Sequence, residues 1–166
     1  MARKFSLFFP IVVAGVALDQ VTKMLVVKGL PLGAQVPVIQ GFFNLMHIHN
    51  RGAAFGMLAH WSLDFARLFF VATTGLVLAV VGYLWWRLPP GRWPAALGYS
   101  LIMAGALGNM IDRVRLGEVI DFLDFYWGRL HWPAFNVADS LVCLGAGLLV
   151  WVILSEEKGA DASDTV

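Results

Sequence analysis

Residues 132–154 read WPAFNVADSLVCLGAGLLVWVIL, and they show most clearly what kind of fold the chain adopts. From Val137 to Leu154 it is an apolar run of transmembrane length, with one charged side chain, Asp139, near its start. A second acid, Asp121, lies upstream within residues 119–122 (VIDF). A charged side chain at the centre of a membrane costs roughly 2.5–3.5 kcal/mol on insertion scales. The presence of two acids at the edge of the hydrocarbon layer therefore predicts that their side chains form a pair with a function.

The composition is that of an integral membrane protein. The chain has 166 residues, of which 59% are hydrophobic and 14% are charged, and its mean hydropathy is +0.73. Soluble domains carry about 25% charged residues. The length predicts a single membrane domain over residues 1–166. A net charge of +1 without a basic run gives no indication of a nucleic-acid partner, and the single Cys143 excludes an intramolecular disulfide.

Four transmembrane helices are predicted, at about residues 5–27, 61–86, 93–112 and 137–154. The first apolar run could instead be a signal peptide, but it continues in a helical pattern without a small-x-small cleavage site, which favours a retained helix. Asp19 and Lys23 are four residues apart, in the order that favours an ion pair on one helical face.

Residues 30–57 break the helical pattern with repeated proline and glycine. Residues 36–39 and 42–49 suit short strands, and residues 50–52 suit a turn, so we expect a small β-sheet lying on the membrane surface. His47 and His49 alternate onto one face. They could begin a metal site, but no third ligand is evident, so interfacial histidines are the preferred interpretation and no metal is expected.

The remaining segments are predicted to be less regular. Residues 116–133 are expected to form a loop rich in interfacial aromatic side chains. Residues 155–166 are polar and small, which predicts a tail without fixed structure. Gly105 and Gly108 in the third helix have the spacing of residues that allow helices to approach closely, so packing is their simplest role.

The distribution of basic residues predicts the topology. Arg3, Lys4, the turn from Arg87 to Arg92, and Lys158 all fall on one side of a four-helix chain, which is expected to be cytoplasmic together with both termini. The unusual polar residues converge at the opposite, extracytoplasmic side. They are Asp19, Asn109, Asp112, Arg113, Asp121 and Asp139.

Two carboxyl groups held close together share one proton and titrate as a unit. One can then take a proton from water while the other donates to a carbonyl oxygen, which is the chemistry of an aspartic peptidase. Neither H-E-x-x-H nor G-x-S-x-G occurs, and no histidine is placed to activate Ser140. Two other acids compete: Asp112, which we expect to pair with its neighbour Arg113, and Asp124, which lies three residues from Asp121.

Two other functions fit a membrane protein with buried acids. A small proton-coupled transporter could use Asp19, Asp121 and Asp139 as relay groups, although it should carry acids near mid-membrane and an internal repeat. A non-catalytic scaffold could use the same polar cluster to join the outer helix ends. The position of the acids at helix ends favours the peptidase.

Five segments taken together resemble the bacterial lipoprotein signal peptidases (signal peptidase II). They are residues 19–23 (DQVTK), 50–56 (NRGAAFG), 108–113 (GNMIDR), 119–122 (VIDF) and 135–140 (FNVADS). The resemblance implies an inner-membrane aspartic endopeptidase with four transmembrane helices and a surface sheet that cradles the substrate. It also implies cleavage of lipid-modified prolipoproteins just before their diacylglyceryl cysteine, without a cofactor.

The resemblance also implies a role for each matching residue. Asp121 and Asp139 would be the catalytic dyad, Asn50, Asn109 and Asn136 would line the site, and Arg113 would contact substrate carbonyl groups. Asp19 and Lys23 would support the sheet and the helix end, while Gly105 and Gly108 would leave room for the lipidated peptide. The resemblance gives His49 and Arg51 no role, although Arg51 could act as a charge that faces the substrate. Prolipoproteins and membrane lipid are the expected partners, and a monomer is the expected state.

Overall fold

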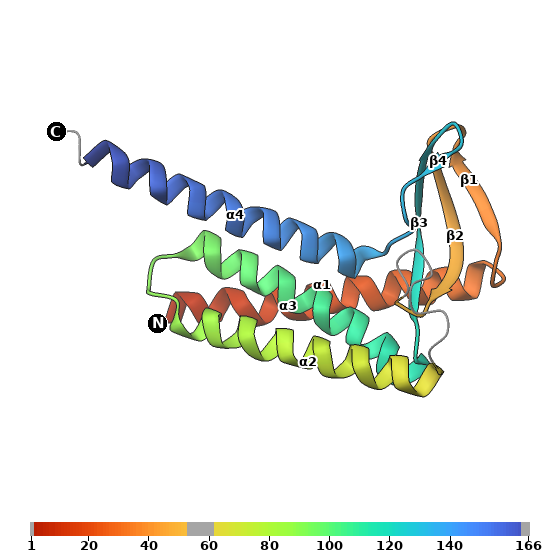
Figure 1. The fold of residues 1–166 in the computed structure, drawn as a ribbon, viewed down its shortest axis with the longest axis horizontal. Coiled ribbons are helices and arrows are strands. Elements are labelled where there is room, and N and C mark those ends of the chain that lie inside the picture. Colours follow the sequence, from red (N-terminus) through yellow and green to blue (C-terminus); the bar gives the residue numbers. More distant parts are fainter. Residues whose placement is uncertain (1, 53–61, 164–166) are drawn as a thin grey trace.

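The computed structural model describes residues 2–52 and 62–163. Within these residues, four helices are long and apolar enough to cross a membrane. They are α1 (Ala2–Gly29), α2 (Leu63–Arg87), α3 (Trp93–Leu116) and α4 (Val137–Ser163) (Figure 1). The four predicted spans are therefore confirmed, and the chain has the architecture of a multi-pass membrane protein.

Helix α3 is the central helix, because it packs against α1, α2 and α4. Most of its buried side chains are small, as in helices that approach each other within a membrane. A Cβ atom on Gly105 would overlap the carbonyl oxygen of Ala138, and one on Gly98 would lie 3.0 Å from the carbonyl oxygen of Gly145. The close contact between α3 and α4 thus depends on glycine at two positions of α3, Gly98 and Gly105.

In the part of the chain that the structure describes, four strands form one antiparallel sheet in the order β1-β2-β3-β4. They are β1 (Gln35–Ile39), β2 (Phe43–Asn50), β3 (Val119–Trp127) and β4 (Leu130–His131). The first two strands confirm the predicted sheet. The turn predicted at residues 50–52 continues into residues 53–61, which lie outside the described part of the chain.

The loop predicted for residues 116–133 was wrong, since β3 is the longest strand of the sheet and β4 pairs with it. The aromatic and β-branched side chains of β3, which suggested a membrane interface, are also the types that favour strands. Gly128, at φ +61°, forms the turn between β3 and β4. Strand β3 then pairs with β2 over most of its length, so segments far apart in sequence meet in one sheet.

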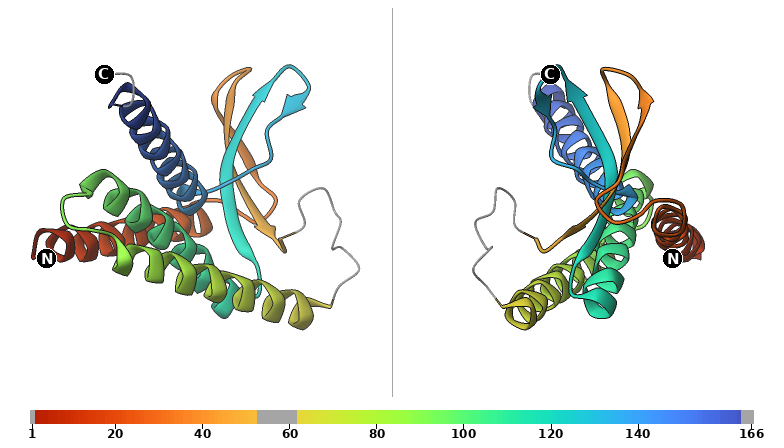
Figure 2. Two further views of the ribbon diagram at one scale, coloured as in Figure 1. Left: turned by 60° about the vertical axis from the view of Figure 1, so that its left-hand side comes forward. Right: turned by 90° about the vertical axis from the view of Figure 1, so that its right-hand side faces the viewer.

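The sheet stands at one end of the helical bundle, and both chain ends lie at the other (Figure 1). The turn that joins α2 to α3 is also at the end opposite the sheet (Figures 1 and 2). The C-terminal ends of α1 and α3 and the N-terminal end of α4 therefore meet beside the sheet. This is the arrangement that brings the polar residues of these three helix ends together.

Two helices extend beyond their predicted ends. Helix α3 continues past residue 112 to Leu116, where Gly117, at φ +79°, donates its N–H to the carbonyl of Arg113 and ends the helix. Helix α4 continues past Leu154 to Ser163, so the tail predicted to lack fixed structure is wrong for most of its length. An ion pair between Glu156 and Arg92 links this extension to the start of α3.

Candidate active site

The N-terminus of α4 positions Asp139 through a reciprocal cap. The Asn136 side chain accepts a 3.0 Å hydrogen bond from the N–H of Asp139, and the Asp139 carboxylate accepts a 3.1 Å bond from the N–H of Asn136. This is the capping-box arrangement, in which the cap residue and the residue three positions later satisfy each other's free N–H groups. The sequence N-V-A-D therefore both starts α4 and holds the Asp139 carboxylate at the N-terminal end of this helix.

Strand β3 supplies Asp121, whose side chain is buried. Its Oδ1 accepts a 2.7 Å hydrogen bond from Asn136, and its Oδ2 accepts a 2.9 Å bond from Asn50 at the end of β2. Asn136 thus contacts both candidate catalytic acids. Burial, together with the charge of Asp139, raises the pKa of Asp121 to about 6, against the lowering effect of the two asparagines.

Asn109 on α3 connects Asp139 to a buried lysine. Lys23 Nζ lies 3.0 Å from Asn109 Oδ1, and Asn109 Nδ2 donates a 2.8 Å hydrogen bond to Asp139. Because an ammonium group can only donate, it fixes the orientation of the Asn109 amide and directs the NH₂ group towards the carboxylate. The resemblance placed Asn109 beside the dyad, and the structure brings it there.

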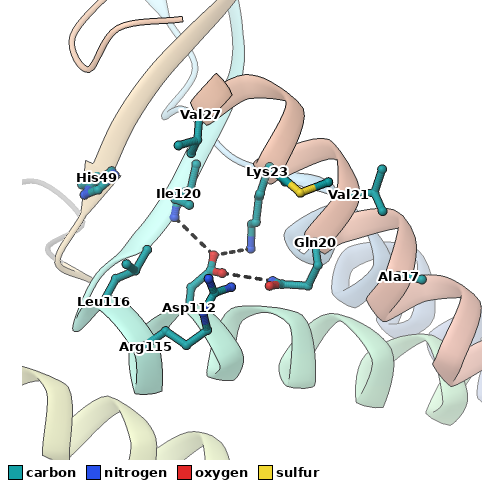
Figure 3. Close-up of a pocket in the computed structure, with 11 residues that line it drawn as sticks. Ala17, Gln20, Val21, Lys23, Val27, His49, Asp112, Arg115, Leu116 and Ile120 are labelled. Atoms are coloured by element: carbon teal, nitrogen blue, oxygen red, sulfur yellow. Dashed lines mark hydrogen bonds and ion pairs between the residues drawn. The ribbon is translucent and has the colours of Figure 1, made fainter. Parts of the chain in front are cut away.

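Lys23 is 1% exposed and has three oxygen partners. Besides Asn109, its ammonium lies 2.9 Å from Asp19 and 2.7 Å from Asp112. Figure 3 draws the contact between Lys23 and Asp112. The predicted ion pair between Asp19 and Lys23 is confirmed. The ion pair predicted for Asp112 also exists, but its partner is Lys23 instead of Arg113, because adjacent residues on a helix do not face each other.

Asp19 joins α1 to the start of α4. Its Oδ1 accepts a 2.9 Å hydrogen bond from the N–H of Ala138, which is one of the free N–H groups at the N-terminus of α4. Gln20, which received no role in the sequence analysis, donates a 3.0 Å bond to Asp112 (Figure 3). Its place within the motif DQVTK was the signal that could have identified it.

Asp124, the competing acid, lies apart from this network. It accepts hydrogen bonds of 2.7 Å from Asn44 and 3.2 Å from Gln35, and contacts His131 at 2.8 Å. Side chains alternate along a strand, so Asp124 and Asp121 project from opposite faces of β3. Asp124 therefore connects β1, β2 and β4, whereas Asp121 faces the start of α4.

The two glycines assigned to the substrate are occupied by protein contacts. Gly105 faces the backbone of α4 at Ala138, and a Cβ atom on Gly108 would lie 2.6 Å from Asp19. The space beside them is filled by α4 and by the Asp19 carboxylate, which supports the packing interpretation for both.

Arg113 lies with its guanidinium 5.1 Å from the centre of the Phe70 ring and interacts with the charges of Asp121 and Asp139.

The two histidines lie on β2 with ring centroids 5.3 Å apart. Within residues 2–52 and 62–163, no three histidine, cysteine or acidic side chains group as metal ligands do. His47 Nδ1 lies 2.8 Å from the carbonyl oxygen of Leu30, and His49 Nδ1 lies 3.0 Å from Glu118. Each ring therefore has a partner that fixes its position within the sheet.

Known proteins share this sequence over most of its length. Residues 11–155 match the family described as Signal peptidase (SPase) II. A lipoprotein signal peptidase from Geobacter metallireducens is 43% identical over 158 residues, which cover 95% of this chain and 96% of that protein. One from Symbiobacterium thermophilum is 48% identical over 152 residues, which cover 89% of this chain and 94% of that protein.

The fold is also shared with solved structures. One, described as a bacterial membrane enzyme, superposes with a TM-score of 0.79 at 34% identity and covers 90% of this chain and 88% of its own. A second of the same description gives a TM-score of 0.76 at 35% identity, over 87% and 90% of the two chains. Sequence and architecture agree, and the chain belongs to the signal peptidase II family.

Proposed function

We propose that the chain is a membrane aspartic endopeptidase that removes signal peptides from prolipoproteins. Its family is one of aspartic peptidases, and its relatives are lipoprotein signal peptidases. The observation that carries the proposal is the pair of contacts made by Asn136, to Asp121 through its side chain and to Asp139 through both backbone and side chain. One residue thereby holds two acids from different elements in a single network.

The raised pKa of Asp121 suggests how the two acids divide their roles. With a pKa of about 6, Asp121 can hold the shared proton near neutral pH and donate it to the oxygen of the scissile carbonyl. Asp139 is half-buried, less covered than Asp121, and is the acid that takes a proton from the attacking water. Water then attacks the carbonyl carbon directly, so no covalent intermediate forms.

The substrate is proposed to be a prolipoprotein that carries diacylglycerol on its cysteine, cleaved just before that cysteine. Arg113, placed against Phe70 within the electrostatic reach of both acids, would bind carbonyl oxygens of the substrate backbone. The acyl chains would lie in the bilayer against exposed apolar faces of the helices. Burial of acyl chains contributes roughly 0.8 kcal/mol per methylene, so the membrane would supply part of the binding energy.

The proposed orientation puts both termini in the bacterial cytoplasm and the sheet outside. Supporting it, the Arg87 to Arg92 turn and both chain ends lie at the end of the bundle opposite the sheet (Figure 1). Short segments with an excess of basic residues stay on the cytoplasmic side. The two acids then lie near the extracytoplasmic face, where the precursor emerges. A monomer is proposed, because both acids and the asparagine that joins them belong to the same chain.

The decisive experiment is cleavage of a lipidated precursor by the purified protein in detergent. Asp121→Asn and Asp139→Asn should each reduce the rate by roughly 10³-fold or more, because each removes a proton-transfer group. Asp124→Asn is the matched control and should retain substantial activity. Both inactive variants should remain folded, as judged by thermal unfolding. An inactive Asp124→Asn together with an active Asp121→Asn would overturn the assignment.

A further inference from the structure

Glu118 joins two residues at the end of β2 that received no role from the family resemblance. Its Oε1 lies 2.6 Å from Arg51 Nε, and its Oε2 lies 3.0 Å from His49 Nδ1. The Glu118 side chain is 14% exposed, although the Arg51 side chain is 63% exposed. One largely covered carboxylate therefore holds the residues on both sides of Asn50.

The strand register explains this geometry. His49 pairs with Ile120 and Asn50 pairs with Val119 in the antiparallel ladder. Continued by one step, the register sets Arg51 opposite Glu118, and directly opposite side chains on one face are the closest in a sheet. Alternation along β2 puts His49 and Arg51 on one face and Asn50 on the other. His49 and Ile120 line one pocket together with residues of α1, so their face of the sheet is the one that borders this helix (Figure 3).

Asn50 meets the candidate dyad on the opposite face. Its Nδ2 donates the 2.9 Å bond to Asp121, while its Oδ1 accepts a 2.8 Å bond from the N–H of Gly52. The second bond fixes which end of the amide faces the carboxylate. The position of the donor therefore depends on the backbone of residues 49–51, and this backbone is what Glu118 holds.

The chemistry of Glu118, Arg51 and His49 suits contacts that persist at neutral pH. Partial burial raises the pKa of Glu118, but hydrogen bonds from Arg51 and His49 and their charges outweigh this and lower it below its ordinary value. The carboxylate is thus ionised at neutral pH and can only accept, so His49 Nδ1 carries a hydrogen. A single exposed ion pair contributes little to stability. Here, by contrast, one largely covered carboxylate, that of Glu118, holds two donor side chains in place.

We propose that Glu118 is a positioning residue, which holds His49 and Arg51 and thereby fixes Asn50 against Asp121. The inference rests on the proposed function, because it assigns Glu118 an effect on the acid that donates the proton. It also gives a role to Arg51 and His49. Glu118 itself does not touch the reacting atoms.

The test compares Glu118→Gln with Glu156→Gln in the precursor cleavage assay. Glu156 forms an acid–arginine pair with Arg92 at the far end of the bundle, so its variant controls for loss of one such pair. Glu118→Gln should lower kcat about ten-fold with little change in KM, less than the roughly 100-fold cost of a 1 Å misplacement. Glu156→Gln should retain the wild-type kcat.

The pH profile provides a readout that a purely structural role would not change. The hydrogen bond from Asn50 lowers the pKa of Asp121. If Glu118→Gln weakens this bond, the pKa of Asp121 should rise, and the alkaline limb of the kcat profile should move to higher pH. Three charged groups face Asp121 from the helices, and all of them are intact in this variant: Asp139, Lys23 and Arg113.

Arg51→Gln provides a second test, because Arg51 is exposed and its replacement should not impair folding. It should reproduce part of the loss in kcat, and the double variant with Glu118→Gln should be no worse than Glu118→Gln alone. Wild-type kcat and an unshifted limb in both variants would overturn the inference. That result together with an inactive Asp121→Asn would leave the proposed function standing, whereas an active Asp121→Asn would contradict the proposed function itself.

Discussion

The side-chain nitrogen of Asn136 lies 2.7 Å from Oδ1 of Asp121. This contact connects a strand to the residue that precedes a membrane helix, since the same asparagine caps α4 and exchanges hydrogen bonds with Asp139. The relative position of the two acids therefore depends on one amide group. The same nitrogen also lies 3.1 Å from Asn109 Oδ1, which places it at the centre of the polar network.

Replacing Asn136 should separate its two roles. Asn136→Ala should reduce kcat by roughly 100-fold, because a small misplacement of a reacting group has an effect of that size. Loss of the helix cap should also reduce the free energy of unfolding by about 1 kcal/mol. Ser140→Ala is the control, since it removes only a 3.0 Å bond to the Asn136 carbonyl. Cleavage rates and thermal unfolding of both variants measure the effects, and an active Asn136→Ala would contradict the bridging role.

The cleavage rate should fall as the pH rises above about 6, where Asp121 loses its proton. The reason is that the proposed donor must be protonated, so each further pH unit should reduce kcat about ten-fold until another pathway dominates. The apparent pKa belongs to the acid pair and not to one residue. A pH profile of kcat tests this, and a rate that is constant from pH 5 to 9 would exclude Asp121 as the proton donor.

The stability of the protein should respond to pH through the same group. The folded-state pKa of Asp121 is raised from 3.8 to about 6, so the native state binds the proton more tightly than the unfolded state does. The stabilisation is complete below pH 3.8 and is lost as the pH rises through about 6, a difference of roughly 3 kcal/mol. The melting temperature of Asp121→Asn relative to wild type should therefore rise between pH 4 and pH 7. A difference that is independent of pH would contradict the raised pKa.

The helices could be predicted from sequence because an apolar run of membrane length has few alternatives. The choice between Asp121 and Asp124 as the second acid of the pair could not be predicted from the residues alone. Residues three apart lie on one face of a helix, and in a loop they have no fixed relation. Once residues 119–127 are known to be a strand, alternation alone puts the two acids on opposite faces. The error in the secondary structure was thus also the reason that this competitor remained open.

The hydrogen-bond partners were the other part that sequence could not supply. The pairing of Asp112 with Lys23 joins residues 89 positions apart, and it depends on how α1 and α3 pack. The roles of Gly105 and Gly108 were open between substrate space and helix packing, and the support for packing comes from the position of α4 and of Asp19, which the sequence does not give. Such long-range contacts leave no local pattern in the chain.

Gly105 should not tolerate a side chain. A Cβ atom there would overlap the carbonyl oxygen of Ala138, which belongs to backbone and cannot rotate away. Gly105→Ala should therefore lower the free energy of unfolding by about 1–3 kcal/mol, and by displacing α4 it should also lower kcat. Gly75→Ala on α2 is the control, because nothing lies within 4 Å of its added methyl group. It should be neutral or stabilising, by up to about 1 kcal/mol. Equal thermal stability of the two variants would contradict the close contact of α3 with α4.

Lys23 should be essential for folding, because its charge neutralises two buried acids. Lys23→Met would leave Asp19 and Asp112, 0% and 2% exposed, without their cation, and breaking a buried ion pair costs about 3–5 kcal/mol. Adding Asp19→Asn and Asp112→Asn removes the unpaired charges, so the triple variant should recover most of the lost melting temperature. It should nevertheless remain impaired in cleavage, since no ammonium then orients Asn109 towards Asp139. A triple variant with wild-type activity would restrict Lys23 to a role in stability alone.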